Sequence, residues 1–126
     1  ELSIRLPERA VSIVGDPHAL RRLFLILLDN GVKYTPGGGR CEVEVAANET
    51  EVVGTVRDTG IGISSDDLPH IFDRFYRVDR ARSREQGGAG LGLAIGRWIA
   101  EAHGGVVAVD SVLERGSSFR VHLPLA

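Results

Sequence analysis

The chain lacks several features that would assign it to a class of protein by composition alone. It has no methionine, and its one cysteine, Cys41, rules out an internal disulfide and fits a reducing compartment. No apolar run approaches the roughly 18 residues needed to span a bilayer; the longest covers residues 23–28, and no signal peptide is visible. Because even an initiator methionine is missing, we interpret the chain as a piece of a longer protein, which leaves open a membrane-bound parent.

The length and composition of the chain are typical of an ordinary folded domain. The 126 residues are 43% hydrophobic and 25% charged, enough for a single core, so we expect one domain over residues 1–126. The net charge of −2 gives no reason to expect a nucleic-acid partner. The local exception is a run of five arginines: Arg74, Arg77, Arg80, Arg82 and Arg84. A solvated surface and a segment that binds phosphates or a partner explain this run equally well.

The first half of the chain predicts two short strands, a long helix and a strand pair. Alternating apolar residues at 2–6 and again at 11–15 are typical of half-buried strands. Asp16 followed by Pro17 is typical of a helix start, because aspartate caps the first N–H groups and proline suits the first helical position. Apolar spacing carries this helix to about Tyr34. Paired strands are then expected at 42–45 and 52–58.

The second half predicts a short helix, a third helix and a closing strand pair. Ser64 or Ser65 is expected to cap a helix that ends near Ile71. The third helix should begin at Gly90 and end at the glycine pair 104–105, with an inner stripe of Leu91, Ala94, Ile95, Trp98, Ile99 and Ala102. The last pair comprises 106–109 and 118–123. This order predicts an α+β fold, a two-layer sandwich with about three helices on one face of a mixed, mostly antiparallel sheet.

Polar side chains near the end of the first predicted helix indicate a nucleotide site. Asn30, Lys33 and Tyr34 are three and four positions apart and therefore share a helix face. An amide oxygen suits Mg²⁺, which takes few protein ligands, and a lysine suits the phosphates that such an ion bridges. One turn earlier the same face carries Ile26, which cannot activate a water molecule. The pattern favours nucleotide binding without a base for hydrolysis.

Two further signals are weak when each is taken alone. The glycine-rich segment 87–92 precedes a predicted helix, whose N-terminus would suit phosphate oxygens. It matches neither the dinucleotide fingerprint nor a P-loop, and a plain flexible loop explains it equally well. Asp58 ends a predicted strand and precedes Gly60 and Gly62, which would leave room for a flat base. Its carboxylate suits an amine such as adenine N6, although an aspartate that bonds its own turn is the commoner case.

Five short motifs in a fixed order give these signals a common meaning. They are residues 30–35 (NGVKYT), 58–63 (DTGIGI), 72–77 (FDRFYR), 88–93 (GAGLGL) and 116–119 (GSSF). The series resembles the N, G1, F, G2 and G3 boxes of the catalytic ATP-binding domain of sensor histidine kinases. The wider group is the Bergerat-fold (GHKL) ATPases and kinases. The resemblance covers nearly the whole chain, and it implies this fold, with ATP and Mg²⁺ as cofactors.

The resemblance also implies roles for the matching residues at the two ends of a nucleotide. Asn30 and Lys33 would be the catalytic pair, because Asn30 would hold Mg²⁺ and Lys33 would pair with a phosphate. Tyr34 would lie near the nucleotide, and Asp58 would accept a hydrogen bond from adenine N6. The remaining base-binding residues would be Gly60, Gly62, Ile63 and Ser118, the last through its hydroxyl.

A mobile lid over the phosphates is implied between about residues 77 and 88. Its aromatic anchor would comprise Phe72, Phe75 and Tyr76, and Arg74 or Arg77 would reach the γ-phosphate. The segment that closes over the phosphates would comprise Gly88, Gly90, Leu91, Gly92 and Leu93. Two positions depart from the family pattern, since Ile26 replaces an asparagine and Ala89 replaces a threonine or serine. Neither change removes a charge, so we expect binding to survive with reduced affinity.

The expected activity is transfer of the ATP γ-phosphate to a histidine on a separate dimerisation domain, with a response regulator downstream. ATP hydrolases of the same fold place a glutamate base where this chain has Ile26. The motif at 72–77 argues against the related serine kinases that act on an anti-sigma antagonist. A regulatory module that binds nucleotide without transfer stays open, because both Ile26 and Ala89 depart from the pattern.

The histidines of the chain offer no acceptor for the phosphate. We interpret His18, His70, His103 and His122 as structural, since none lies in an acidic dimerisation helix. His103 would sit at a helix C-terminus, where the helix dipole favours a cation. The acceptor would then belong to the rest of the parent. We expect the isolated chain to be monomeric, and the parent to be a homodimer anchored in the bacterial cell membrane, with this domain in the cytoplasm.

Overall fold

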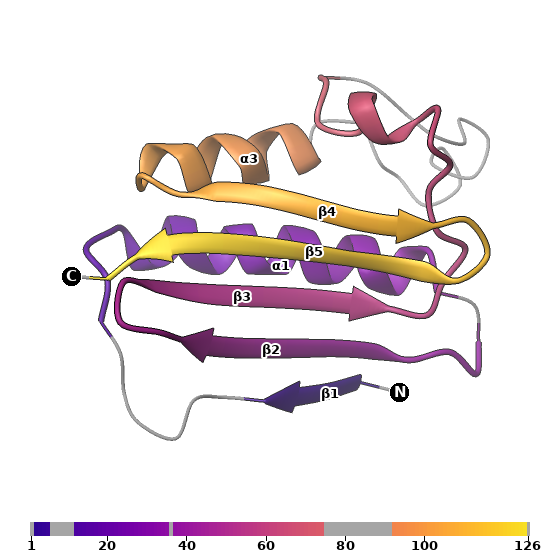
Figure 1. Cartoon of the computed structure of the whole chain (residues 1–126), viewed down its shortest axis with the longest axis horizontal. Helices are drawn as coiled ribbons and strands as arrows, with labels where there is room; N and C mark the ends of the chain where they lie inside the picture. Colours follow the sequence, from indigo (N-terminus) through magenta and orange to yellow (C-terminus); the bar gives the residue numbers. More distant parts are fainter. Residues whose placement is uncertain (1, 6–11, 36, 75–91, 126) are drawn as a thin grey trace.

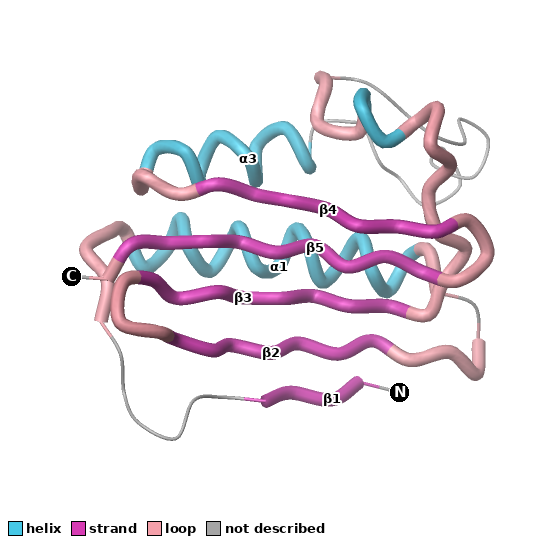
Figure 2. Tube along the Cα trace, in the orientation of Figure 1, coloured by secondary structure: helices cyan, strands magenta, loops and turns pink. Residues whose placement is uncertain are grey.

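The computed structural model describes residues 2–5, 12–35, 37–74 and 92–125. They form β1 (Leu2–Arg5), α1 (Pro17–Lys33), β2 (Cys41–Ala47), β3 (Glu51–Asp58), the 3₁₀ helix η1 (Leu68–His70), α3 (Gly92–Ala102), β4 (Val106–Val112) and β5 (Gly116–Pro124). Figures 1 and 2 show two layers, a sheet and the helices α1 and α3 against one of its faces. Within the described part, no helix combines the length and apolarity that a membrane span requires.

The five strands form one sheet in the order β1-β2-β3-β5-β4. β1 pairs with β2 in parallel, whereas the other three pairs are antiparallel. The register places Cys41 opposite Asp58, Asp58 opposite Ser117, and Ser117 opposite Ser111. These four residues therefore form one row across β2, β3, β5 and β4. The mixed, mostly antiparallel sheet with helices on one face confirms the predicted fold class.

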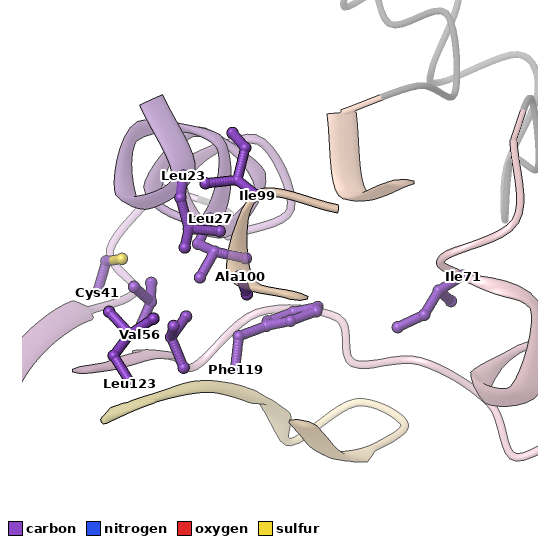
Figure 3. Packing of buried hydrophobic residues seen from close by; sticks show 10 residues of the cluster. Leu23, Leu27, Cys41, Val56, Ile71, Ile99, Ala100, Phe119 and Leu123 are labelled. Atoms are coloured by element: carbon purple, nitrogen blue, oxygen red, sulfur yellow. The ribbon is translucent and has the colours of Figure 1, made fainter. Parts of the chain in front are cut away.

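The core lies between the helices and the inner face of the sheet. Alternate residues of the central strands face the helices, because successive side chains of a strand point to opposite faces. Figure 3 shows the resulting cluster, which includes Leu23 and Leu27 of α1, Ile99 and Ala100 of α3, and Val56, Phe119 and Leu123 of the sheet. Burying a large apolar side chain contributes roughly 1.5–3 kcal/mol. This cluster therefore holds the two layers together.

A side-chain cap begins α1 as predicted. Asp16 Oδ1 accepts hydrogen bonds from the N–H groups of His18 at 2.9 Å and Ala19 at 3.4 Å. The Asp16 N–H donates to His103 Nε2 at 3.0 Å, and His103 Nδ1 lies 2.8 Å from the carbonyl oxygen of Ile99. A ring that accepts at Nε2 and donates from Nδ1 is neutral. His103 therefore links the end of α3 to the start of α1. In this arrangement the ring is not the cation that we expected at the helix C-terminus.

The opposite face of the sheet, as far as the structure describes it, carries two ion pairs and a histidine–glutamate contact. Arg57 lies 3.5 Å from Glu42, Arg120 lies 2.6 Å from Asp110, and His122 lies 3.2 Å from Glu51. Pairs with this exposure contribute at most about 1 kcal/mol each. They keep this face hydrated and add little to the stability of the fold.

Two local predictions were wrong, and a third needs refinement. Residues 12–16 form no strand. Trp98 is 69% exposed and Ala102 is also exposed, because α3 turns Gly96 toward Leu23 and Ile26 and buries that side instead. The expected short helix near Ile71 is reduced to the three residues of η1, and the Ser64 hydroxyl donates to the Asp67 carboxylate at 2.8 Å.

Glu114, in the β4–β5 turn, is expected to store backbone strain. Its φ is 67°, and within the described residues it alone combines a positive φ with a side chain. Glu114→Gly should raise the free energy of unfolding by about 0.5–1 kcal/mol, because glycine removes the strain but gives the unfolded chain more freedom. Urea unfolding measures the change. Arg115→Gly is the matched control and should lower stability, so a shared direction in the two variants would contradict the prediction.

Candidate functional site

The predicted site residues within the described part gather at one end of the sheet. α1 ends there at Lys33, β3 ends there at Asp58, and β4 turns there into β5, at the right-hand edge of Figure 1. The Ile61 N–H donates to the Tyr34 carbonyl oxygen at 3.0 Å, and the Glu114 N–H donates to the Ile61 carbonyl oxygen at 2.6 Å. The turn after β3 is therefore clamped between the end of α1 and the β4–β5 turn.

The two carboxylate oxygens of Asp58 have different surroundings. The residue is 7% exposed, and Oδ1 accepts hydrogen bonds from the Gly60 N–H at 2.9 Å and the Ser117 N–H at 3.3 Å. Oδ2 accepts none from the residues that the structure describes. Burial raises the pKa of this carboxyl, although the two backbone N–H groups oppose the rise. Oδ1 therefore fixes the turn, as the local interpretation of Asp58 expects, and the role of Oδ2 toward a ligand stays a prediction.

Gly60 and Gly62 are required by the protein's own backbone. A Cβ on Gly60 would lie 2.2 Å from the Tyr34 carbonyl oxygen. Gly62 has a φ of 71°, and a Cβ there would lie 2.2 Å from the Val112 carbonyl oxygen. The sequence suggested that these glycines leave room for a base. The contacts give a different reason, since the absent side chains let α1 and the β4–β5 turn close on the loop from two sides.

The end of α1 carries the predicted metal and phosphate residues. Lys33 Nζ lies 3.1 Å from Asp29 Oδ2. The Asn30 side-chain amide has no hydrogen-bond partner among the described residues. Gly31, which the sequence analysis did not single out for the site, brings this end of the helix close to the sheet. A Cβ on Gly31 would lie 3.2 Å from Cys41 Sγ and 3.7 Å from Asp58 Oδ2.

Ile26 packs against α3. Its Cγ2 lies 3.7 Å from the place of a Cβ on Gly92 and 3.6 Å from that on Gly96. The position that would carry a glutamate base in a hydrolase is thus part of an apolar helix–helix contact. Of the predicted phosphate-covering residues, Gly92 begins α3 and is exposed, whereas Leu93 packs partly buried against the core.

The two neighbouring serines Ser117 and Ser118 lie on opposite faces of the sheet. Ser118 lies opposite Arg57 and Asp110, on the hydrated face of the sheet. Ser117 lies on the inner face, and its N–H donates to Asp58. The hydroxyl next to Asp58 is therefore that of Ser117 rather than that of Ser118, because strand alternation puts neighbouring residues on opposite faces. A role of either hydroxyl in base binding stays a prediction. The sequence analysis also missed Ser111, whose hydroxyl accepts from the Ile63 N–H at 2.7 Å. Ser111 could be found only from the sheet register, which places it opposite Ser117.

The predicted lid, about residues 77–88, lies outside the described residues, and its predicted anchor is described only at Phe72. Phe72 packs edge-to-face on Phe119, with ring centroids 6.3 Å apart, and Arg97 lies over its ring at 5.8 Å. This contact fastens the chain to the core at Phe72. Arg74 is exposed. Seven residues named in the predictions for the lid and the phosphate cover lie outside the described residues: Phe75, Tyr76, Arg77, Gly88, Ala89, Gly90 and Leu91.

Comparison with known proteins places this geometry in a family. Residues 15–126 match the family described as histidine kinase-, DNA gyrase B-, and HSP90-like ATPase. Sensor histidine kinase RppB of Synechocystis sp. is 45% identical over 125 residues, which are 99% of this chain and 28% of the relative. Signal transduction histidine-protein kinase ArlS of Staphylococcus aureus is 39% identical over 116 residues, 92% of this chain and 26% of the relative.

Solved structures agree with these relatives. The mycobacterial sensor histidine kinase MprB has a TM-score of 0.84 at 30% identity, covering 98% of this chain and 84% of that one. Full-length ShkA in complex with AMPPNP has a TM-score of 0.83 at 32% identity, covering all of this chain and 26% of that one. The chain spans about a quarter of the length of the curated relatives it matches. The chain belongs to the family of histidine kinase-, DNA gyrase B- and HSP90-like ATPases, and within it to the ATP-binding domains of sensor histidine kinases.

Proposed function

We propose that this domain binds Mg·ATP and presents the γ-phosphate to a histidine on a separate dimerisation domain of the same parent. The proposal rests on the different surroundings of the two Asp58 carboxylate oxygens. Oδ1 accepts from two backbone N–H groups, and Oδ2 has no hydrogen-bond partner among the described residues. A buried acceptor of this kind suits the exocyclic amine of adenine. The end of α1, with Asn30 and Lys33, lies next to it, as the approach of Gly31 to Asp58 requires.

The phosphate end is assigned to the termini of α1 and α3. Lys33 supplies a positive charge, and the N-terminal end of α3 would offer backbone N–H groups and the positive end of a helix dipole. The side-chain amide of Asn30, without a described partner, fits Mg²⁺, because this ion takes one or two protein oxygens alongside phosphate and water. When bound, the ion would neutralise phosphate charge. The roles of Tyr76, Arg77, Gly88, Gly90 and Leu91 stay predictions.

Transfer to another domain fits this site better than hydrolysis. Ile26 is packed between the helices, and its side chain cannot take a proton from an attacking water. Phosphoryl transfer depends mainly on positioning and charge neutralisation, which Lys33 and Asn30 would provide. The acceptor histidine, the response regulator and the membrane anchor would belong to the other three quarters of a parent of the relatives' length.

Transfer from labelled ATP tests the proposed activity. The chain would be mixed with γ-labelled ATP, Mg²⁺ and the separate dimerisation domain of the RppB relative, which is 45% identical in the part aligned here. We expect label on that domain's histidine, recognised by its lability in acid. Free phosphate formed without the acceptor would indicate a hydrolase instead. ATP binding with no label transferred would indicate a regulatory module.

Asn30→Ala should abolish the Mg²⁺ dependence of ATP binding. The variant removes the one amide oxygen proposed to reach the ion, so added Mg²⁺ should no longer increase the affinity measured by isothermal titration. Asn48→Ala is the matched control, because it removes an amide from the β2–β3 turn at the opposite end of the sheet. An unchanged response to Mg²⁺ in Asn30→Ala would refute the assignment.

Asp58→Asn should stabilise the nucleotide-free domain at neutral pH while weakening ATP binding. Burial raises the pKa of Asp58 above its ordinary value of 3.8, so the folded protein holds this proton to higher pH than the unfolded chain does. The contribution of Asp58 to stability therefore falls as the pH rises between the two pKa values. Asparagine avoids that loss, because its oxygen can still accept from Gly60 and Ser117.

Urea unfolding at two pH values measures this effect. The variant should exceed the wild type in stability at about pH 7. The difference should shrink at about pH 3, where Asp58 of the wild type is mostly protonated in both the folded and the unfolded state. Titration of other groups is common to the two proteins and cancels in the difference. A variant less stable than the wild type at neutral pH would contradict the prediction.

A further inference from the structure

The hydroxyl of Ser111 makes three hydrogen bonds at the back of the base-binding turn. It accepts from the Ile63 N–H at 2.7 Å, donates to the Gly116 carbonyl oxygen at 3.0 Å and lies 2.8 Å from Ser117 Oγ. The sheet register puts Ser111 opposite Ser117, and Ser117 opposite Asp58. The three side chains are therefore neighbours in one row on the inner face of the sheet.

These bonds determine the direction of the contact between the two hydroxyls. A serine hydroxyl has one hydrogen to donate and two lone pairs to accept with. The contacts with Gly116 and with Ser117 can both be hydrogen bonds at once only if Ser111 donates to the Gly116 carbonyl oxygen, which can only accept, and Ser117 donates to Ser111. We infer this arrangement, in which the second lone pair of Ser111 is also filled. The Ser117 hydroxyl has no hydrogen left, so it can offer a ligand only an acceptor.

The arrangement places an acceptor on each of two residues that face each other across β3 and β5. Asp58 Oδ2 accepts no hydrogen bond from the described residues, and Ser117 Oγ is limited to accepting by Ser111. An exocyclic amine carries two N–H donors and matches such a pair, either directly or through a bridging water. A base with a carbonyl oxygen at the same place would put a third acceptor next to Asp58 Oδ2 and Ser117 Oγ, with no hydrogen to share between them.

We propose that Ser111 is a positioning residue for base selection, because it turns the Ser117 hydroxyl into an acceptor beside Asp58. The inference rests on the proposed function, since it concerns the base that the same site receives. Ser111 itself would not touch the nucleotide. It acts through Ser117, and it decides between an amine and a carbonyl at position 6 of a purine.

Paired titrations with ATP and inosine triphosphate test this role on the 126-residue chain. The two nucleotides differ in whether position 6 carries an amine or a carbonyl. In Ser111→Ala the Ser117 hydroxyl regains a hydrogen that it can donate to a carbonyl. The ratio of ATP affinity to inosine triphosphate affinity should fall about three- to tenfold, the effect of one hydrogen bond.

Three further variants separate selection from simple loosening of the turn. Ser111→Thr keeps the hydroxyl and should keep the ratio within about twofold of the wild type. In a Ser117→Ala background, Ser111→Ala should have no further effect on the ratio, because the residue through which it acts is gone. Thr50→Ala, which removes a hydroxyl from the β2–β3 turn at the opposite end of the sheet, should leave the ratio unchanged.

A purely structural role gives a different result. It would weaken the two nucleotides equally in Ser111→Ala and leave the ratio at the wild-type value, and that outcome would overturn the inference. If the alanine variant fails to fold, Ser111→Cys replaces it, and its weaker donor and acceptor should give an intermediate ratio. A wild-type chain that binds neither nucleotide would refute the proposed function instead, so the two failures are distinguishable.

Discussion

The site depends on one carboxylate that is held by two separate parts of the chain. Asp58 Oδ1 accepts from Gly60, two residues ahead, and from Ser117, which lies fifty-nine residues away on β5. The first bond shapes the turn after β3, and the second fixes that turn to the neighbouring strand. Because both bonds use the same oxygen, the other oxygen keeps its direction without being used by the fold. Further hydrogen bonds hold the loop in the position that this carboxylate requires. The Ile61 N–H donates to the Tyr34 carbonyl oxygen, and the Ile61 carbonyl oxygen accepts from the Glu114 N–H.

Close approach of the helices to the sheet, and to one another, brings the second half of the site to Asp58. Gly31 allows the last turn of α1 to approach Cys41 and Asp58, and Gly96 allows α3 to approach Leu23 and Ile26. Ile26 therefore serves packing at a place where a carboxylate would have to be buried against another helix. Burying an unpaired charge there would cost far more than an apolar contact. Ile26 thus leaves this position without a side chain that could take a proton from water, where the resemblance implies a glutamate in hydrolases of the same fold.

Local signals predicted most of the fold, whereas the details of the site depended on contacts between distant residues. Asp16 and Pro17 mark the start of α1 within a few positions of sequence, and the structure confirms them. The choice between Ser117 and Ser118 could not be made in this way, because it depends on which face of β5 meets the helices. Ser111 had no signal of its own, since its partners Ile63 and Ser117 are joined to it only through the sheet. Trp98 was misplaced for a similar reason, because the buried side of α3 is formed by Gly96, Ile99 and Ala100.

The row of Cys41, Asp58, Ser117 and Ser111 would set recognition of a base by Asp58 against the stability of the free domain. Burial raises the pKa of Asp58, and that of the Cys41 thiol is raised by burial and by the nearby Asp58 charge. The shift of Asp58 reflects a carboxylate charge that the folded protein accommodates poorly, whereas the raised pKa of Cys41 favours its uncharged thiol. A ligand that donates hydrogen bonds to Asp58 Oδ2 and to the Ser117 hydroxyl would relieve this strain, whereas one that accepts would increase it. The proposed selectivity for an amine would therefore follow from the unfavourable burial of acceptors as much as from any attractive contact.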